Sequence, residues 1–385
     1  MNSVTISDII NKATDIIRLP KVVNSAEDYF TELYRYLDLY QKFIYSEPEL
    51  KPCTETSDYI CNEIKRIESL YFSGEYDETN QCIRKIIRKL LAIEQQHFIC
   101  SLDDLYNDYE KSHWFRMRTG TYYNYTKEEL NHIPASKRKN VENFRYSVNG
   151  VPCLYLGHSI IGCWEEFKRK KLDELWVSRF WPVRPLKLFN ISTTANELRY
   201  ADMYLRYAKN EDGLAQAAIE FFSIWPLQCA CSMIIKEQNR IFKEEYVIPQ
   251  LLMMNLKQFN IHGIMYFCTR QENVYLTDIS WLFKNIAIPA FDLSKETMYS
   301  PFIEESFAVS QPMNIGMFNA GITPAKYEIN ILQSNSARTD PKVYIGNVGY
   351  CYSDTVFFRA ENELLQEYYG LRDEVRNKNL KSIEE

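Results

Sequence analysis

The chain has 385 residues, of which 46% are hydrophobic and 25% charged, and its formal net charge is −6. This is the composition of a globular protein with a substantial core, and the acidic balance excludes a general electrostatic footprint for DNA or RNA. No apolar run approaches the ~20 residues needed to cross a bilayer, and we see no secretory signal. With ten scattered cysteines, these features favour a cytoplasmic protein with reduced thiols, no membrane contact and no metal site.

The first hundred residues are predicted to form helices. Ser25 and Asp28 make a variant of the capping box ahead of helical spacing in residues 29–44. Gly74 is a suitable C-cap for the helix that follows. We therefore interpret residues 1–105 as a helical N-terminal region with a regulatory or oligomerisation role.

From about His113 the pattern changes to short aromatic strands separated by Gly, Pro and Asn. The predicted strands are residues 114–120, 152–157, 175–181, 186–191, 263–270 and 285–291. The predicted helices between them are residues 159–170, 194–209, 214–225 and 244–259. This mixture predicts an α+β domain over residues 106–310. A C-terminal β/α extension follows over residues 311–385.

The central part of this domain resembles the RES family, whose members are NAD-degrading enzymes known mainly as bacterial toxins. The features of the resemblance are, in order, an Arg-aromatic-small pattern at Arg145, a Gly-x-Pro turn at Gly150, a Leu-Tyr-Leu strand around Tyr155, and a helix with the pair Glu165 and Glu166. Upstream, Arg116 matches the family's early arginine. Downstream, residues 262–270 look like the strand that brings the family's serine. The resemblance covers roughly residues 113–290.

The resemblance implies the roles of the candidate site residues. The family spacing of eleven residues from Tyr155 gives Glu166 as the catalytic carboxylate, with Glu165 as the fallback. Arg116 and Arg145 are the candidates for contact with the NAD pyrophosphate, because an arginine fork suits a phosphate. The expected NAD-binding residues are Arg116 or its neighbour Arg118, Tyr155, and Cys268 or Thr269 at the position of the family's serine. The alternative for the arginines is a surface ion pair, and for Tyr155 a place in the core.

The resemblance also implies a fold and an activity. The fold is a mixed β core like that of ADP-ribosyltransferases. The activity is cleavage of the nicotinamide–ribose bond of NAD by phosphorolysis or hydrolysis, in a toxin or phage-defence effector. NAD is then the substrate, inorganic phosphate is a co-substrate in the first case, and no other cofactor is needed. An antitoxin or regulatory protein is an expected partner, and a homo-oligomer is a further alternative.

Two other classes of function remain open at this point. An ADP-ribosyltransferase would use the same NAD chemistry with a macromolecule as acceptor. A non-catalytic interaction protein would keep the fold and lack the reaction. Incubation of the pure protein with NAD distinguishes the three classes by the products that form.

Overall fold

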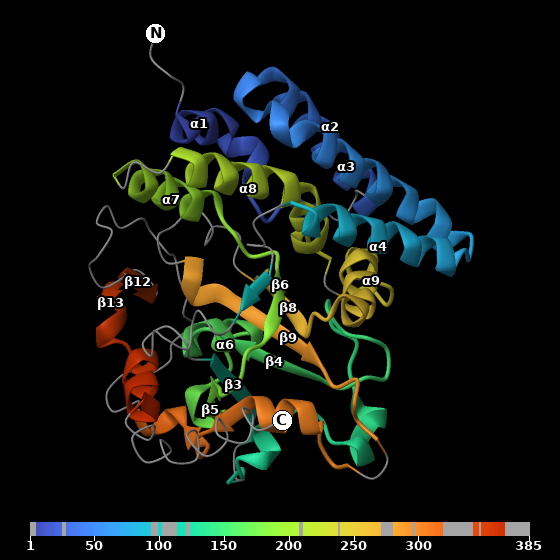
Figure 1. The fold of residues 1–385 in the computed structure, drawn as a ribbon. Helices are drawn as coiled ribbons and strands as arrows, with labels where there is room; N and C mark the ends of the chain where they lie inside the picture. Colours follow the sequence, from blue (N-terminus) through green and yellow to red (C-terminus); the bar gives the residue numbers. More distant parts are fainter. Residues whose placement is uncertain are drawn as a thin grey trace. The chain divides into compact units, whose positions relative to one another are not determined.

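The computed structural model describes residues 5–24, 28–93, 99–101, 114–120, 124–207, 211–237, 239–270, 280–294, 297–318, 342–345 and 348–365. The chain divides into two compact units, which are drawn in Figure 1. Unit 1 comprises Met1–Ile99, Phe144–Tyr146 and Phe189–Asn260. Unit 2 comprises Cys100–Asn143, Ser147–Leu188 and Ile261–Glu385. This division differs from the expected one, because residues 189–260 group with the N-terminal helices.

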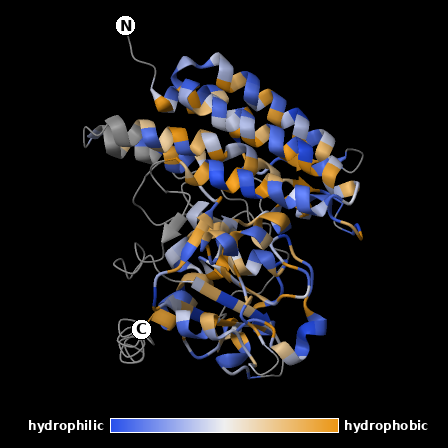
Figure 2. Ribbon diagram, turned by 45° about the vertical axis from the view of Figure 1, so that its right-hand side comes forward, coloured by the Kyte–Doolittle hydropathy of each residue, from blue (hydrophilic) through white to orange (hydrophobic). Residues whose placement is uncertain are grey.

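Unit 1 is mainly helical. Its helices are α1 (Ile6–Ile17), α2 (Tyr29–Ser46), α3 (Lys51–Phe72), α4 (Tyr76–Leu91), α7 (Ala195–Tyr207), α8 (Glu211–Ser232) and α9 (Val247–Leu256). A short parallel pair joins β1 (Val22–Val23) to β7 (Ile234–Ile235). Figure 2 shows hydrophilic and hydrophobic residues alternating along the long helices, as expected for helices with one buried face.

The ends of the N-terminal helices follow ordinary capping chemistry. The Asp28 side chain accepts a hydrogen bond from the backbone N–H of Thr31 at 3.0 Å and begins α2, whereas Ser25 lies outside the described residues. Gly74 follows α3 with a φ of 85°, a conformation that glycine adopts readily. The predicted C-cap is therefore confirmed.

The core of unit 1 explains why α8 belongs with the N-terminal helices. The Tyr40 ring stacks on Trp225 of α8 with centroids 4.1 Å apart. The Trp225 indole N–H donates to the Ile17 carbonyl at 2.9 Å. The Tyr29 hydroxyl donates to the Ala230 carbonyl at 2.6 Å. These buried contacts join segments about two hundred residues apart into one core.

Unit 2 is built on an antiparallel sheet. Its strands are β3 (Trp114–Thr119), β4 (Cys153–Gly157), β5 (Leu175–Pro182), β8 (Gly263–Phe267), β9 (Lys284–Pro289), β10 (Phe307–Val309) and β11 (Met313–Asn314). The order is β10-β5-β3-β4-β9-β8, β11 also pairs with β5, and the sheet continues from β8 through β6 (Lys187–Asn190) and β2 (Ile99–Ser101). A separate hairpin joins β12 (Lys342–Ile345) to β13 (Val348–Cys351). The predicted α+β class is confirmed.

The strands of unit 2 alternate between two apolar cores. Leu154 and Leu156 of β4 belong to one core. Phe115 and Met117 of β3 belong to the other, together with the short helix α6 (Ile160–Glu166). This is the two-residue period expected of strands that are covered on both faces.

The two central strands meet over a short length. Phe115 of β3 is opposite Gly157 of β4, whereas β4 pairs with β9 from Cys153 to Gly157. Beyond the first pair, the Arg116 side chain bridges the strands, because its Nη1 donates to the Tyr155 carbonyl at 3.0 Å. Between β3 and β4, one arginine side chain thus adds to a short backbone pairing.

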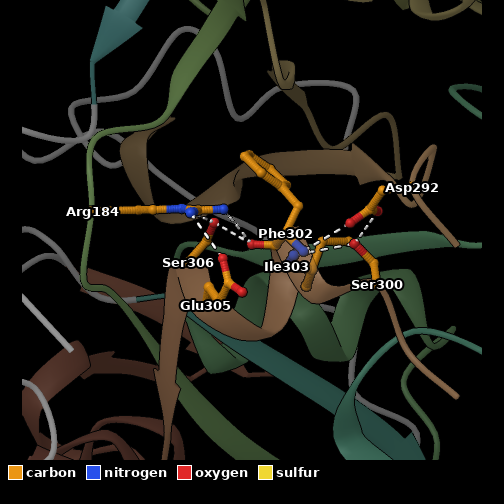
Figure 3. A network of polar contacts seen from close by, with 7 residues as sticks. All are labelled: Arg184, Asp292, Ser300, Phe302, Ile303, Glu305 and Ser306. Carbon is orange, nitrogen blue, oxygen red and sulfur yellow. Dashed lines mark hydrogen bonds and ion pairs between the residues drawn. The ribbon is translucent and has the colours of Figure 1, made fainter. Parts of the chain in front are cut away.

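A polar network fixes helix α10 (Pro301–Ser306) beside β10. Figure 3 shows its members, Arg184, Asp292, Ser300, Phe302, Ile303, Glu305 and Ser306. The Asp292 carboxylate accepts from the Ser300 hydroxyl at 2.5 Å and from the Phe302 N–H at 2.8 Å, so it caps the start of α10. Arg184 donates to the Phe302 carbonyl at 2.9 Å. We interpret this network as a structural support for α10.

Candidate functional site

Helix α6 carries the two candidate glutamates. The Ser159 hydroxyl caps its start by accepting from the Gly162 N–H at 2.9 Å. The helix ends at Glu166, earlier than the expected end near residue 170. Lys168 and Arg169 explain the early end, because their φ values of 55° and 54° are left-handed and incompatible with a continuing helix.

The two glutamates have different surroundings. Glu165 is 3% exposed and forms an ion pair with Arg169, whose Nε lies 2.9 Å from Oε2. The side chain of Glu166 is 34% exposed. Its Oε1 accepts from Asn285 Nδ2 at 2.9 Å, and Arg270 Nε lies 3.5 Å from its Oε2. Glu165 is thus buried in an ion pair, and Glu166 is the glutamate that solvent and a ligand can reach.

Cys268 lies beside Glu166. It follows β8 directly and is fully buried. Burial raises the pKa of the Cys268 thiol well above its ordinary value, and the negative charge of Glu166 raises it further. The thiol is therefore protonated and hydrogen-bonds to Glu166. Thr269, the alternative at this position, is partly buried.

Asn285 is a site residue that the sequence analysis missed. It is 3% exposed and lies on β9 opposite Gly157 and Tyr266. A Cβ on Gly157 would lie 3.2 Å from Asn285 Oδ1 and 2.7 Å from Cys163 Sγ, so a larger residue there would displace these side chains. The signal in the sequence was a polar residue at the start of an apolar strand, which alone does not distinguish a site from a strand end.

Arg116 and Arg118 lie two residues apart, on the same face of β3. Arg118 Nη2 donates to the Asn131 carbonyl at 2.7 Å, and Arg116 Nη1 contacts Tyr155 as described above. The Nε atoms of both arginines are buried and have no hydrogen-bond partner among the described residues. The site therefore has donor capacity that an anion could use.

The electrostatics around these arginines are positive. The pKa of Arg116 is lowered to about 9, chiefly by burial and also by the charge of Arg118. Burial also lowers the pKa of Arg118. The pKa of His132 falls to about 4, chiefly through burial and also through the charges of both arginines. Arg116 therefore remains charged at neutral pH, and His132 is neutral.

Tyr155 lies on β4 beside this pair. Its ring is partly buried, and its hydroxyl lies 3.0 Å from the Ser147 hydroxyl. Unit 2 thus contains all of the candidate residues discussed so far, namely Arg116, Arg118, Tyr155, Glu165, Glu166, Cys268 and Thr269.

Arg145 belongs to unit 1 instead. Its guanidinium donates to the carbonyls of Cys231 at 3.0 Å and Met233 at 2.9 Å, with a longer bond to Glu245 at 3.4 Å. The ring of Tyr246 lies 5.3 Å from it. The structure thus shows Arg145 holding backbone carbonyls of unit 1, and it does not group Arg145 with the residues of unit 2.

Metal and membrane features were searched within the described part of the chain. No group of three or more His, Cys, Asp and Glu side chains there could hold a metal ion. Among the same residues, no helix is both long and apolar enough to span a bilayer.

The chain is similar to a protein named Putative toxin YopC from Bacillus subtilis (strain 168), with 33% identity over 207 residues. The similarity covers 52% of this chain and 46% of that protein, so the chain spans about half the length of the curated relative it matches. No protein-family model and no solved structure matches the chain. The comparison thus relates the chain to a protein that is named a toxin.

Proposed function

We propose that the chain cleaves the nicotinamide–ribose bond of NAD, by phosphorolysis or hydrolysis, and acts as a toxin or defence effector. The observation that carries the proposal is the position of Glu166. Its carboxylate is accessible and is held by Asn285 from a central strand. It lies in the same unit as the paired arginines of β3. The resemblance of residues 113–290 to the RES family supports the same reaction.

The chemistry requires one well-placed carboxylate. When the bond between the anomeric carbon and the ring nitrogen breaks, its electron pair goes to the nicotinamide, which leaves as a neutral molecule. Positive charge then develops on the ribose, and a nearby carboxylate stabilises it. Water or inorganic phosphate attacks the anomeric carbon. Attack by water releases one proton and gives ADP-ribose, whereas attack by phosphate gives ADP-ribose phosphate.

The arginines of β3 suit the other end of the substrate. The pyrophosphate of NAD carries two negative charges, and buried guanidinium groups bind such groups through charge-assisted hydrogen bonds. We assign this contact to Arg116 and Arg118, whose buried Nε atoms lack partners in the described part of the chain. Arg145 is less suited to this contact, because backbone carbonyls of unit 1 occupy its donors. The Tyr155 ring is assigned to stacking on the nicotinamide.

The similarity to Putative toxin YopC supports the biological role. An enzyme that depletes NAD must be restrained in the cell that makes it. We therefore propose an antitoxin or regulatory protein as its partner.

The test is to incubate the full chain with NAD, with and without inorganic phosphate, and to separate the products by chromatography. We expect free nicotinamide together with ADP-ribose, or with ADP-ribose phosphate when phosphate is present. Label from NAD on a protein or nucleic acid would instead show a macromolecular ADP-ribosyltransferase. The absence of any product would contradict both activities.

A further inference from the structure

The start of α6 is bound by a carboxylate from the C-terminal part of unit 2. Glu361 lies in the helical residues 356–365. Its Oε1 accepts a hydrogen bond from the Ile160 N–H at 2.6 Å and another from the Tyr352 hydroxyl at 2.7 Å. Glu361 is 6% exposed and Tyr352 is 2% exposed. A buried carboxylate about two hundred residues away thus satisfies the first N–H group of the helix that carries Glu166.

Apolar packing joins the same two segments. The ring of Trp164 on α6 lies 5.1 Å from that of Phe357, measured between centroids. Ala360 and Leu364 belong to the same core as Ile161. Helix α6 has seven residues, which is too short to be stable by itself. Its position therefore depends on its caps and on the segments that pack against it.

Three groups besides burial act on the charge state of Glu361. They are the Tyr352 hydroxyl, the Ile160 N–H and the charge of Arg179 on β5. The charge of Glu361 in turn raises the pKa of Cys163 on α6. The pKa of Glu361 is raised to about 7, because burial raises it by more than the hydrogen bonds from Tyr352 and Ile160 and the charge of Arg179 lower it. Both the ionised and the protonated carboxyl can accept the two hydrogen bonds through one oxygen.

We propose that Glu361 is a positioning residue, which together with Tyr352 fixes the start of α6 and thereby the place of Glu166 at its end. This inference rests on the proposed function of Glu166. It gives the C-terminal residues 352–361 a role in the catalytic unit. Capping of the short helix from a distant segment allows that segment to control where the catalytic carboxylate lies.

The first test compares Glu361→Ala, Glu361→Gln and Glu363→Ala in the full chain. Glu361→Ala leaves two buried donors without an acceptor. It should lower kcat for NAD by a factor on the order of ten to a hundred, as expected when a catalytic group is displaced. KM should stay near the wild-type value, because Arg116 and Arg118 lie on β3. Glu361→Gln keeps an oxygen acceptor and should restore most of kcat. Glu363 is exposed on the same helix, so its variant should be wild-type.

The second test is hydrogen–deuterium exchange of the amides of residues 159–167, which does not depend on activity. Exchange should be faster in Glu361→Ala than in Glu361→Gln. If Glu361→Ala does not fold, Tyr352→Phe is the alternative, because it removes one of the two hydrogen bonds to Glu361. It should lower kcat and speed the exchange of these amides, both by less than Glu361→Ala would. Wild-type kcat in a folded Glu361→Ala or Tyr352→Phe variant would overturn the proposal, as would unchanged exchange.

The two proposals fail in different ways. If the wild-type chain releases no nicotinamide from NAD, the proposed function fails. Faster exchange of α6 in Glu361→Ala would then still support the anchoring of this helix by Glu361, and unchanged exchange would overturn it.

Discussion

Arg116 and Arg118 place two like charges close together on one strand, where burial lowers the pKa of both. Such an arrangement disfavours the ligand-free fold and favours an anionic ligand. We therefore expect Arg116→Met to raise KM for NAD at least about tenfold, since a charge-assisted hydrogen bond contributes roughly 1.5–3 kcal/mol. The thermal midpoint of the ligand-free variant should change little, because relief of the burial of this charge and of its repulsion by Arg118 offsets the lost hydrogen bond to the Tyr155 carbonyl.

Steady-state kinetics and thermal unfolding of the same preparation check this prediction. Arg138→Met is the control, because Arg138 is exposed in unit 2. A normal KM combined with a lower midpoint would show that Arg116 serves the fold and not the ligand.

Asn285 holds the carboxylate of Glu166, the proposed catalytic group, through a neutral donor. Asn285→Asp keeps the shape and places a second carboxyl group at the position of the amide, 2.9 Å from Glu166 in the wild type. Two carboxylates at such a distance cannot both ionise readily, so one pKa rises. The acidic limb of the pH–kcat profile should move to higher pH, and kcat at neutral pH should fall. Asn140→Asp, at an exposed position of unit 2, should leave the profile unchanged. An unshifted pH–kcat profile in Asn285→Asp would show that Asn285 does not hold the carboxylate on which kcat depends.

At the scale of elements, Glu361 makes the stability of unit 2 depend on pH. Its pKa is raised from 4.5 to about 7 in the folded state, so the folded chain binds this proton more tightly than the unfolded chain. The stabilising effect is therefore complete below pH 4.5 and is lost as pH rises through about 7. The unfolding free energy of the wild type relative to Glu361→Gln should fall over this interval, by at most about 1.4 kcal/mol per pH unit for one proton. Denaturant titrations of both proteins across this pH range measure the difference in unfolding free energy. A difference that does not change with pH would contradict the prediction.

The elements with strong local signals were predictable from the sequence. The strand around Tyr155 and the glycine after α3 lie where their patterns placed them, and β8 begins at the predicted Gly263 but ends at Phe267, before Cys268. The end of α6 was not predictable, because it depends on left-handed backbone at Lys168 and Arg169, which are not residues that usually adopt it. The contacts of Asn285 and Glu361 with α6 were not predictable either. They join residues more than a hundred positions apart, and no local pattern encodes such pairs.

At the scale of the whole molecule, the two units are each built from separated parts of the chain. Helix α8 packs against the N-terminal helices through Trp225. A chain that starts at Ser101 would therefore expose the buried faces of α8, and we expect it to be insoluble or to bind a hydrophobic dye. Expression and dye binding of this truncated chain check the prediction. A soluble, folded product that cleaves NAD would show that the N-terminal helices are an independent module.

The central claim is that Glu166 stabilises the charge that develops when NAD loses nicotinamide. The most direct measurement is the rate of nicotinamide release by the purified full chain and by Glu166→Gln and Glu165→Gln. Glu166→Gln keeps the shape and removes the charge, so NAD binding should persist while kcat falls by about 10²–10³. Glu165 is buried in an ion pair with Arg169, so Glu165→Gln should retain far more activity wherever it folds. Full activity of Glu166→Gln would contradict the account.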